Sequence, residues 1–150
     1  MKTAEDILKE KKRTMICVGM EATVFDVIKT MVDRRIGAII VRDGEKIVGI
    51  FTERDFIRQS VREGFDPKTT TMEDAMSKDL QAVPFDASIP KLQDIILGKC
   101  VRHLLVQKEG RYIGLLSAGD VTRADINEKT KTLASVSWDY YENWRWDKDK

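Results

Sequence analysis

This chain contains the same pattern twice, with the second copy 65 positions after the first and no gap between equivalent residues. Val18 corresponds to Val83, and "AIIV" at positions 38–41 corresponds to "HLLV" at positions 103–106. A gapless repeat of this period predicts two copies of one structural unit. The other equivalent pairs are Thr23 and Ser88, Gly49 and Gly114, Thr52 and Ser117, Asp55 and Asp120, and Arg58 and Arg123.

Each copy is predicted to run strand, helix, strand, strand, helix. In the first copy, "TVFDVIKTMVDRR" places apolar residues at helical spacing, with Thr23 as a plausible N-cap. "GAIIV" and "KIVGIF" flank the turn "RDGE", as expected of paired strands. We expect a lead-in with a helix at 1–14, the first repeat at 15–64, a linker at 65–75, the second repeat at 76–125, and a C-terminal helix with an aromatic tail at 126–150.

The expected fold class is α+β. Each unit would expose an apolar face of its sheet that the unit cannot cover alone. Packing the two sheets together about a pseudo-twofold axis covers both faces. That arrangement places the two strand-to-helix corners in clefts where the units meet, and such clefts are common ligand sites.

The corners themselves allow two interpretations. Thr52 and Ser117 each stand where a helix N-cap belongs, with an aspartate three residues later, which is a variant of the capping box and needs no ligand. The other interpretation is a nucleotide site, because an aspartate at a helix start can accept hydrogen bonds from a ribose diol. Gly49 and Gly114 precede the two hydroxyl residues by three positions and allow close approach of another group.

The segments "IGAIIVRDGEKIVGIFTERDFIR" and "VRHLLVQKEGRYIGLLSAGDVTR", with the opening "DILKEK", closely resemble paired CBS domains, the Bateman module. The resemblance covers roughly residues 4–125. It implies a stand-alone regulatory CBS pair with no enzymatic activity and no catalytic cofactor. It further implies a homodimer and an adenosine-containing ligand such as AMP, ADP, ATP, S-adenosylmethionine or NAD. A protein effector of unknown identity would receive the signal.

Carried over to this sequence, the resemblance implies two sites, each built from both repeats. In the first site, Asp55 would hold the ribose and Thr52 the ribose edge or the phosphate, and in the second Asp120 and Ser117 would do the same. Four basic residues are candidates for phosphate contacts: Arg54, Arg58, Arg102 and His103. The adenine slot of the first site would be lined by Ala82, Ala87 and Val101, and that of the second by Cys17, Ala22, Ile36 and Ala38.

Two departures from the family pattern affect these sites. Cys17 and Ala82 stand where many members have a threonine, which removes a hydroxyl from each site. Gly37 and Ala38 stand in the first repeat where the second has Arg102 and His103, so the clefts differ in charge. We therefore expect at most one tight site and favour the Thr52/Asp55 cleft.

Composition argues against other classes of function. The formal net charge is +1, which gives no general attraction to nucleic acid or to an anionic membrane. No apolar run approaches the roughly 20 residues that span a bilayer, and a cytoplasmic location is expected. No cluster of His, Cys and acidic residues suggests a metal site, and no serine has a plausible His and acid partner for catalysis.

The C-terminal segment supports an alternative function. The stretch "SVSWDYYENWRWDKDK" contains Trp138, Tyr140, Tyr141, Trp144 and Trp146. So much apolar surface favours a segment that packs on its own domain, on a dimer partner or on another protein. The alternative is thus a structural or oligomerisation module that binds no physiological nucleotide and acts through this tail.

Overall fold

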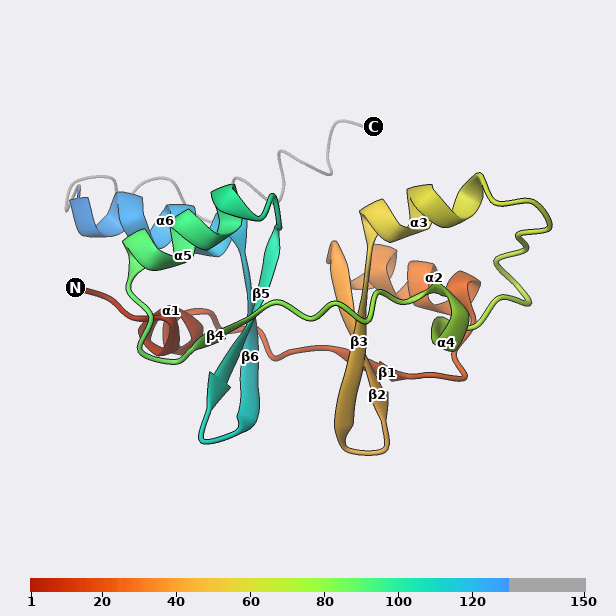
Figure 1. Ribbon diagram of the computed structural model, residues 1–150, viewed down its shortest axis with the longest axis horizontal. Helices are drawn as coiled ribbons and strands as arrows, with labels where there is room; N and C mark the ends of the chain where they lie inside the picture. Colours follow the sequence, from red (N-terminus) through yellow and green to blue (C-terminus); the bar gives the residue numbers. More distant parts are fainter. Residues whose placement is uncertain (130–150) are drawn as a thin grey trace.

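The structure is a computed structural model that describes residues 1–129 of the chain. Its first repeat comprises β1 (Cys17–Gly19), α2 (Val24–Arg34), β2 (Ala38–Asp43), β3 (Lys46–Thr52) and α3 (Glu53–Ser60). Its second repeat comprises β4 (Ala82–Pro84), α5 (Ile89–Gly98), β5 (His103–Lys108), β6 (Arg111–Ser117) and α6 (Ala118–Lys129). Two further helices, α1 (Ala4–Glu10) and α4 (Met72–Ala75), precede the first and second repeats (Figure 1).

Each repeat contains a mixed sheet of three strands, in the order β1-β2-β3 or β4-β5-β6. The first strand of each sheet is parallel to the second, and the second is antiparallel to the third. Both sheets have a register shift at the same place, between Val41 and Arg42 in one and between Val106 and Gln107 in the other. The α+β class and the strand-helix-strand-strand-helix order predicted from the repeat are confirmed.

Both faces of each sheet are buried. Ile39 and Val41 lie on the helix side of β2, in the core of the first repeat. Ile40 lies between them in the sequence and therefore points to the opposite face, yet it is also fully buried. Its equivalent Leu105 is buried in the same way, between two residues of the second core. Figure 1 shows the two sheets in the middle of the molecule, with α2 and α3 on the outer side of one and α5 and α6 on the outer side of the other. By strand alternation, Ile40 and Leu105 lie on the face of each sheet that is turned away from its own helices.

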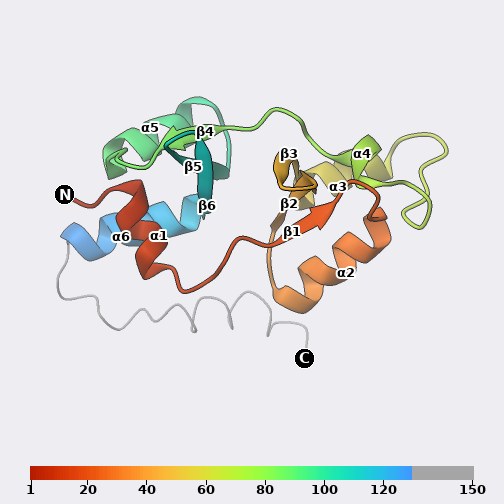
Figure 2. The same ribbon diagram turned by 90° about the horizontal axis from the view of Figure 1, so that it is seen from below.

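The two short helices pack on the repeat that does not follow them directly. The amide of Ala4 in α1 donates to the carbonyl of Ala87 at 2.9 Å, in the second repeat. The amide of Met72 in α4 donates to the carbonyl of Ala22 at 2.8 Å, in the first repeat. Helix α1 contacts α6 and helix α4 contacts α3, and Figure 2 shows both pairs side by side. Each repeat is therefore completed by the lead-in of the other.

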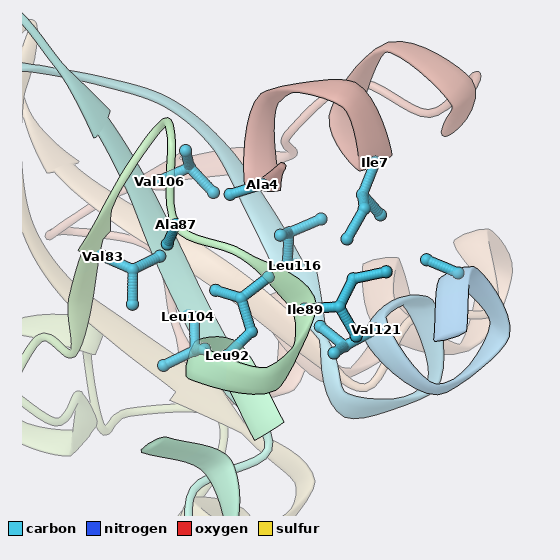
Figure 3. Packing of buried hydrophobic residues seen from close by; sticks show 11 residues of the cluster. Ala4, Ile7, Val83, Ala87, Ile89, Leu92, Leu104, Val106, Leu116 and Val121 are labelled. Carbon is cyan, nitrogen blue, oxygen red and sulfur yellow. The ribbon is translucent and has the colours of Figure 1, made fainter. Parts of the chain in front are cut away.

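Side chains from these helices belong to the hydrophobic cores. Ala4 and Ile7 of α1 are buried in the core of the second repeat, next to Leu116 and Val121 (Figure 3). Met72 and Ala75 of α4 are buried in the core of the first repeat. Because both cores need them, the lead-ins are structural parts of the repeats and not free connections.

A second sequence repeat, which the spacing of 65 does not reveal, explains this exchange. "TAEDIL" at 3–8 and "TMEDAM" at 71–76 are 68 positions apart and form the two lead-in helices. Their contacts are equivalent as well, because Thr3 bridges to Ser88 and Thr71 bridges to Thr23. The segment 65–75, predicted as a linker, thus includes all of helix α4, which completes the first core.

The exchange also accounts for the two glycines before the corners. A Cβ atom on Gly114 would lie 2.7 Å from Cδ1 of Leu8, and one on Gly49 would meet the Sδ atom of Met76. Leu8 and Met76 are equivalent positions of the two lead-ins. The group whose close approach these glycines allow is therefore a side chain of the other repeat's lead-in, not a ligand.

We predict that Gly114→Ala lowers the free energy of unfolding by about 1–3 kcal/mol, because the added methyl group overpacks the contact with Leu8. Gly98→Ala is the matched control, since nothing lies within 4 Å of a Cβ there and the site is in a helix. That control should be neutral or stabilising by up to about 1 kcal/mol. Urea unfolding measures both. Leu8→Ala should restore part of the loss, and equal effects at both glycines would contradict this packing.

Candidate functional site

The first corner is the junction of β3 and α3. Thr52 is the N-cap of α3, and its backbone amide and hydroxyl both donate to Oδ2 of Asp55, at 2.9 and 3.0 Å. The amide of Asp55 returns a bond to the Thr52 hydroxyl at 3.2 Å. Oδ1 of Asp55 lies 3.5 Å from a guanidinium nitrogen of Arg58, whose side chain is 68% exposed. The carboxylate is buried beside the start of a helix, where negative charge is favoured.

The second corner is the junction of β6 and α6 and repeats this geometry. The amide and hydroxyl of Ser117 donate to Oδ2 of Asp120 at 2.7 and 2.8 Å. The same oxygen also accepts a bond of 2.7 Å from Nζ of Lys11, which follows α1. This ammonium is only 21% exposed. The two corners thus share the capping box predicted from sequence and differ in the cation that neutralises the aspartate.

The strand register brings several predicted residues to the corners. Ala38 lies opposite Thr52, and His103 lies opposite Ser117. The carbonyl of Gly37 accepts from the amide of Glu53, and at the second corner the carbonyl of Arg102 accepts from the amide of Ala118. Ala38 is buried and His103 half-buried, while the side chain of Arg102 is exposed. Each corner therefore lies beside the start of the second strand of its own repeat, β2 or β5.

One contact joins the first corner to the second repeat. An Nη1 atom of Arg54, at the start of α3, donates to the carbonyl of Cys100 at 3.5 Å. Cys100 directly precedes Val101 and Arg102, so this bond brings their loop to the Thr52/Asp55 corner. The equivalent of Arg54 in the second repeat is Gly119, which has no side chain to make such a bond. The first corner therefore has a basic side chain that reaches across to the second repeat.

Two predicted slot residues lie at the far end of the sheets. The amide of Ala87 donates to the carbonyl of Pro84. Pro84 lies opposite Gln107, which is four residues along β5 from His103. At roughly 3.3 Å per residue, that is about 13 Å from the corner end. Ala22 occupies the equivalent place in the first repeat, and both carbonyls are used to anchor lead-in helices. The structure thus does not bring Ala22 or Ala87 to the corners.

The remaining predicted slot residues have mixed surroundings. Cys17 lies opposite Ile40 and is half-buried, and this burial raises the pKa of its thiol, so it is a neutral group at physiological pH. Ala82 lies at the start of β4 and is exposed. Val101 and Ile36 both pack against the helix-side cores, and so offer at most part of their side chains to a slot.

Ile36 also lines an apolar groove of about 250 Å³ on the helix side of the first repeat. The groove lies between α2 and α3, away from the sheet faces that cover each other. The residues that line it are Ile28, Met31, Val32, Ile36, Glu53, Phe56 and Ile57.

Within residues 1–129, no group of three or more His, Cys, Asp or Glu side chains is placed to hold a metal ion. None of the helices in that same range is long and apolar enough to cross a membrane. The aromatic tail, to which the sequence assigns a packing or docking role, lies outside the described residues. Lys11 was not predicted as a site residue, and the "TAEDIL" repeat is the sequence signal that could have placed its helix near the second corner.

Comparison with known proteins gives a consistent result. The CBS domain pattern matches residues 3–62 and 72–127. The mitochondrial CBS domain-containing protein CBSX3 of Arabidopsis thaliana is 30% identical over 144 residues, covering 90% of this chain and 70% of that protein. A CBS-domain protein of Burkholderia ambifaria, solved as a putative signal-transduction protein, is 34% identical with a TM-score of 0.80, covering 89% of this chain and all of that one.

A CBS domain protein of Pyrobaculum aerophilum, solved in complex with AMP, has the same fold at 20% identity. Its TM-score is 0.67, and the match covers 79% of this chain and 89% of that one.

We predict that the two aspartates differ in their contribution to stability. Asp55→Ala removes a cap and a favourable dipole interaction, which should cost about 0.5–2 kcal/mol of unfolding free energy. Asp120→Ala should cost roughly 1 kcal/mol more, because it also leaves the partly buried Lys11 ammonium without its carboxylate. Urea unfolding of both variants measures the difference. In a Lys11→Met background the extra cost should disappear, and equal costs in the natural background would rule out a stabilising Lys11–Asp120 pair.

Proposed function

This chain belongs to the CBS domain family, whose members are regulatory and not catalytic, and we propose that it binds an adenine nucleotide between its two repeats. The ligand would be AMP, ADP or ATP, with S-adenosylmethionine and NAD as the other adenosine-containing candidates. In this role the protein senses a metabolite and passes the signal on through protein contacts.

The observation that carries the proposal is the hydrogen bonding of the two Asp55 carboxylate oxygens. Its Oδ2 atom already accepts both bonds from Thr52 and is fully used by the cap. Within residues 1–129, its Oδ1 atom has a long contact of 3.5 Å with the exposed side chain of Arg58. A buried carboxylate oriented by its own cap, with one oxygen left for a further donor, is suited to accept the hydroxyls of a ribose.

Basic groups near this corner support a phosphorylated ligand. Arg54 reaches from α3 toward the loop of the second repeat, and Arg58 is one turn further along the same helix. The backbone of Arg102 lies in that loop, two residues beyond the Cys100 carbonyl. Arginine suits phosphate oxygens because its guanidinium offers several donors in one plane. Parts of Val101 and Ala82 would contact the adenine ring.

Binding across the two repeats supplies a mechanism for sensing. A ligand that contacts α3 of the first repeat and the 99–102 loop of the second favours the relative orientation in which both contacts can form. It can shift the population of orientations only by its difference in affinity between them. The AMP complex of the Pyrobaculum relative supports the ligand class at the level of the shared fold.

We predict that one of the five adenosine-containing candidates raises the melting temperature of the protein by several degrees. At 100 times its dissociation constant a ligand adds about 2.7 kcal/mol to the unfolding free energy. Asp55→Ala should abolish the shift. The 2′-deoxy form of the same nucleotide should bind about 10-fold or more weakly, since it lacks one hydroxyl that the carboxylate accepts from. Thermal unfolding and titration calorimetry measure these effects.

Asp33→Ala is a suitable control, because it removes an exposed carboxylate from α2 and should leave the shift unchanged. If none of the five adenosine-containing candidates changes the melting temperature, the nucleotide proposal fails. The structural and oligomerisation role then becomes the leading interpretation.

We further propose that the chain forms a homodimer through its helix side, the outer surface of helices α2, α3, α5 and α6. Val32 and Leu97 are equivalent positions on α2 and α5 and are 56% and 75% exposed. Val61 and Ile126, which are equivalent positions at α3 and α6, are also exposed. Exposed apolar residues at matching places on both repeats make a surface with the pseudo-twofold symmetry of the pair, and a second copy of this chain can match such a surface.

We predict that Ile57→Glu, at the edge of the apolar groove, converts a dimer into a monomer. Ile113→Glu is the matched control, because Ile113 is exposed but lies in β6, outside the helix side. Light scattering after gel filtration gives the mass of each species. A monomeric natural protein, or a dimer that survives Ile57→Glu, would remove the support for this interface.

We also propose that the protein is located in the cytoplasm. CBSX3, the Arabidopsis relative, is named as mitochondrial.

A further inference from the structure

We infer that Lys11 closes the second corner from within the chain, so that the protein takes up one nucleotide at the Thr52/Asp55 corner and none at the Ser117/Asp120 corner. This inference rests on the proposed nucleotide-binding function and specifies which of the two equivalent sites is open. It makes Lys11 a specificity-determining residue that acts by occupying a ligand position.

The Lys11 ammonium is held by two acceptors of the second repeat. It donates to Oδ2 of Asp120 at 2.7 Å and to the carbonyl of Leu115 at 3.0 Å. The side chain of Asp120 is 5% exposed. A charged hydrogen bond in such surroundings is stronger than one in open water. A ribose that binds Asp120 therefore has to compete with a cation already in place.

Helix α1 holds Lys11 in this position from several points. A capping box between Thr3 and Asp6 starts the helix, and Ile7 is buried in the second core. Glu5 accepts a bond of 2.9 Å from Nζ of Lys108 in β5. That bond lowers the pKa of Glu5 and raises the pKa of Lys108, so both remain charged near neutral pH. Because these contacts anchor α1 along its length, they also fix the position of Lys11 at its C-terminal end, beside the second corner.

At the first corner the backbone takes the place that Lys11 has at the second. Ile50 is the equivalent of Leu115, and its carbonyl accepts from the backbone amide of Ser77 at 2.8 Å. After α4 the main chain itself satisfies this carbonyl, whereas after α1 a lysine side chain does so. The residue that matches Lys11 in the other lead-in is Asp79, which accepts from Gln81 and carries the wrong charge to pair with Asp55.

The two corners therefore differ because of the residues that follow their lead-in helices, and not because of their capping boxes. The two boxes have the same donors, acceptors and distances to within 0.2 Å. At the first corner the cation near the aspartate is Arg58, which is 68% exposed and 3.5 Å away, so a ligand can replace it easily. At the second corner the cation is a partly buried lysine with two short bonds.

The experiment is titration calorimetry with AMP on the natural protein and on variants at three positions. The natural protein should bind one AMP per chain, lose it with Asp55→Ala and keep it with Asp120→Ala. Lys11→Met removes the ammonium but keeps most of the side-chain length, and it should raise the stoichiometry to two, with the new site lost on adding Asp120→Ala. Affinity at the second corner should rise about tenfold or more.

Lys11→Arg is the matched control, because it keeps the positive charge and should keep the stoichiometry at one. If Lys11→Met proves unstable, Lys11→Ala gives the same comparison. Two AMP molecules per natural chain, loss of binding with Asp120→Ala, or an unchanged single site in Lys11→Met would each overturn the inference while leaving the nucleotide proposal intact. An absence of binding in every variant would instead overturn the proposed function, and this inference with it.

Discussion

The exchange of lead-in helices is the contact on which the rest of this molecule depends. Neither core is closed by its own repeat, since α1 supplies buried residues to the second repeat and α4 supplies them to the first. The exchange links the two repeats twice, once from each side, and so constrains how their sheets can meet. It also requires a glycine in β3 and in β6, where a lead-in side chain lies against the strand. The corners come immediately after these strands, so their position follows from the same contact.

The same exchange makes two nearly identical corners unequal. A symmetric pair with symmetric lead-ins would present two equal sites. Here the main chain after α4 runs beside β3 as an extra bridge between Ile50 and Ser77, while the chain after α1 does not. The carbonyl left over at Leu115 is satisfied by Lys11, whose charge then pairs with Asp120. The different backbone paths after α1 and α4 thus give the two corners different local charges.

The sequence predicted the repeated unit and its corners because these depend on local chemistry. Periodicity, turn residues and capping boxes act over a few positions, and Thr52/Asp55 and Ser117/Asp120 form the boxes their spacing indicates. The sequence did not predict which end of the sheet Ala22 and Ala87 occupy, nor that Lys11 meets Asp120, 109 positions away. Those facts depend on strand register and on the crossing of lead-ins. Only the "TAEDIL" and "TMEDAM" match at a different spacing carried a signal of that crossing.

Helix α3 connects the proposed ligand corner to the proposed dimer surface. Its first turn contains Asp55, buried at the corner, and the next two residues, Phe56 and Ile57, line the apolar groove on the opposite side. The helix has only eight residues, and the side chain of Gln59 ties it to the carbonyl of Ala75 in the exchanged helix α4 at 3.4 Å. A ligand that contacts Asp55 and Arg54 would act on one short helix. Any shift of that helix would also move Phe56 and Ile57 in the groove. Sensing and output then need no long pathway through the core, because both are functions of the two faces of one helix.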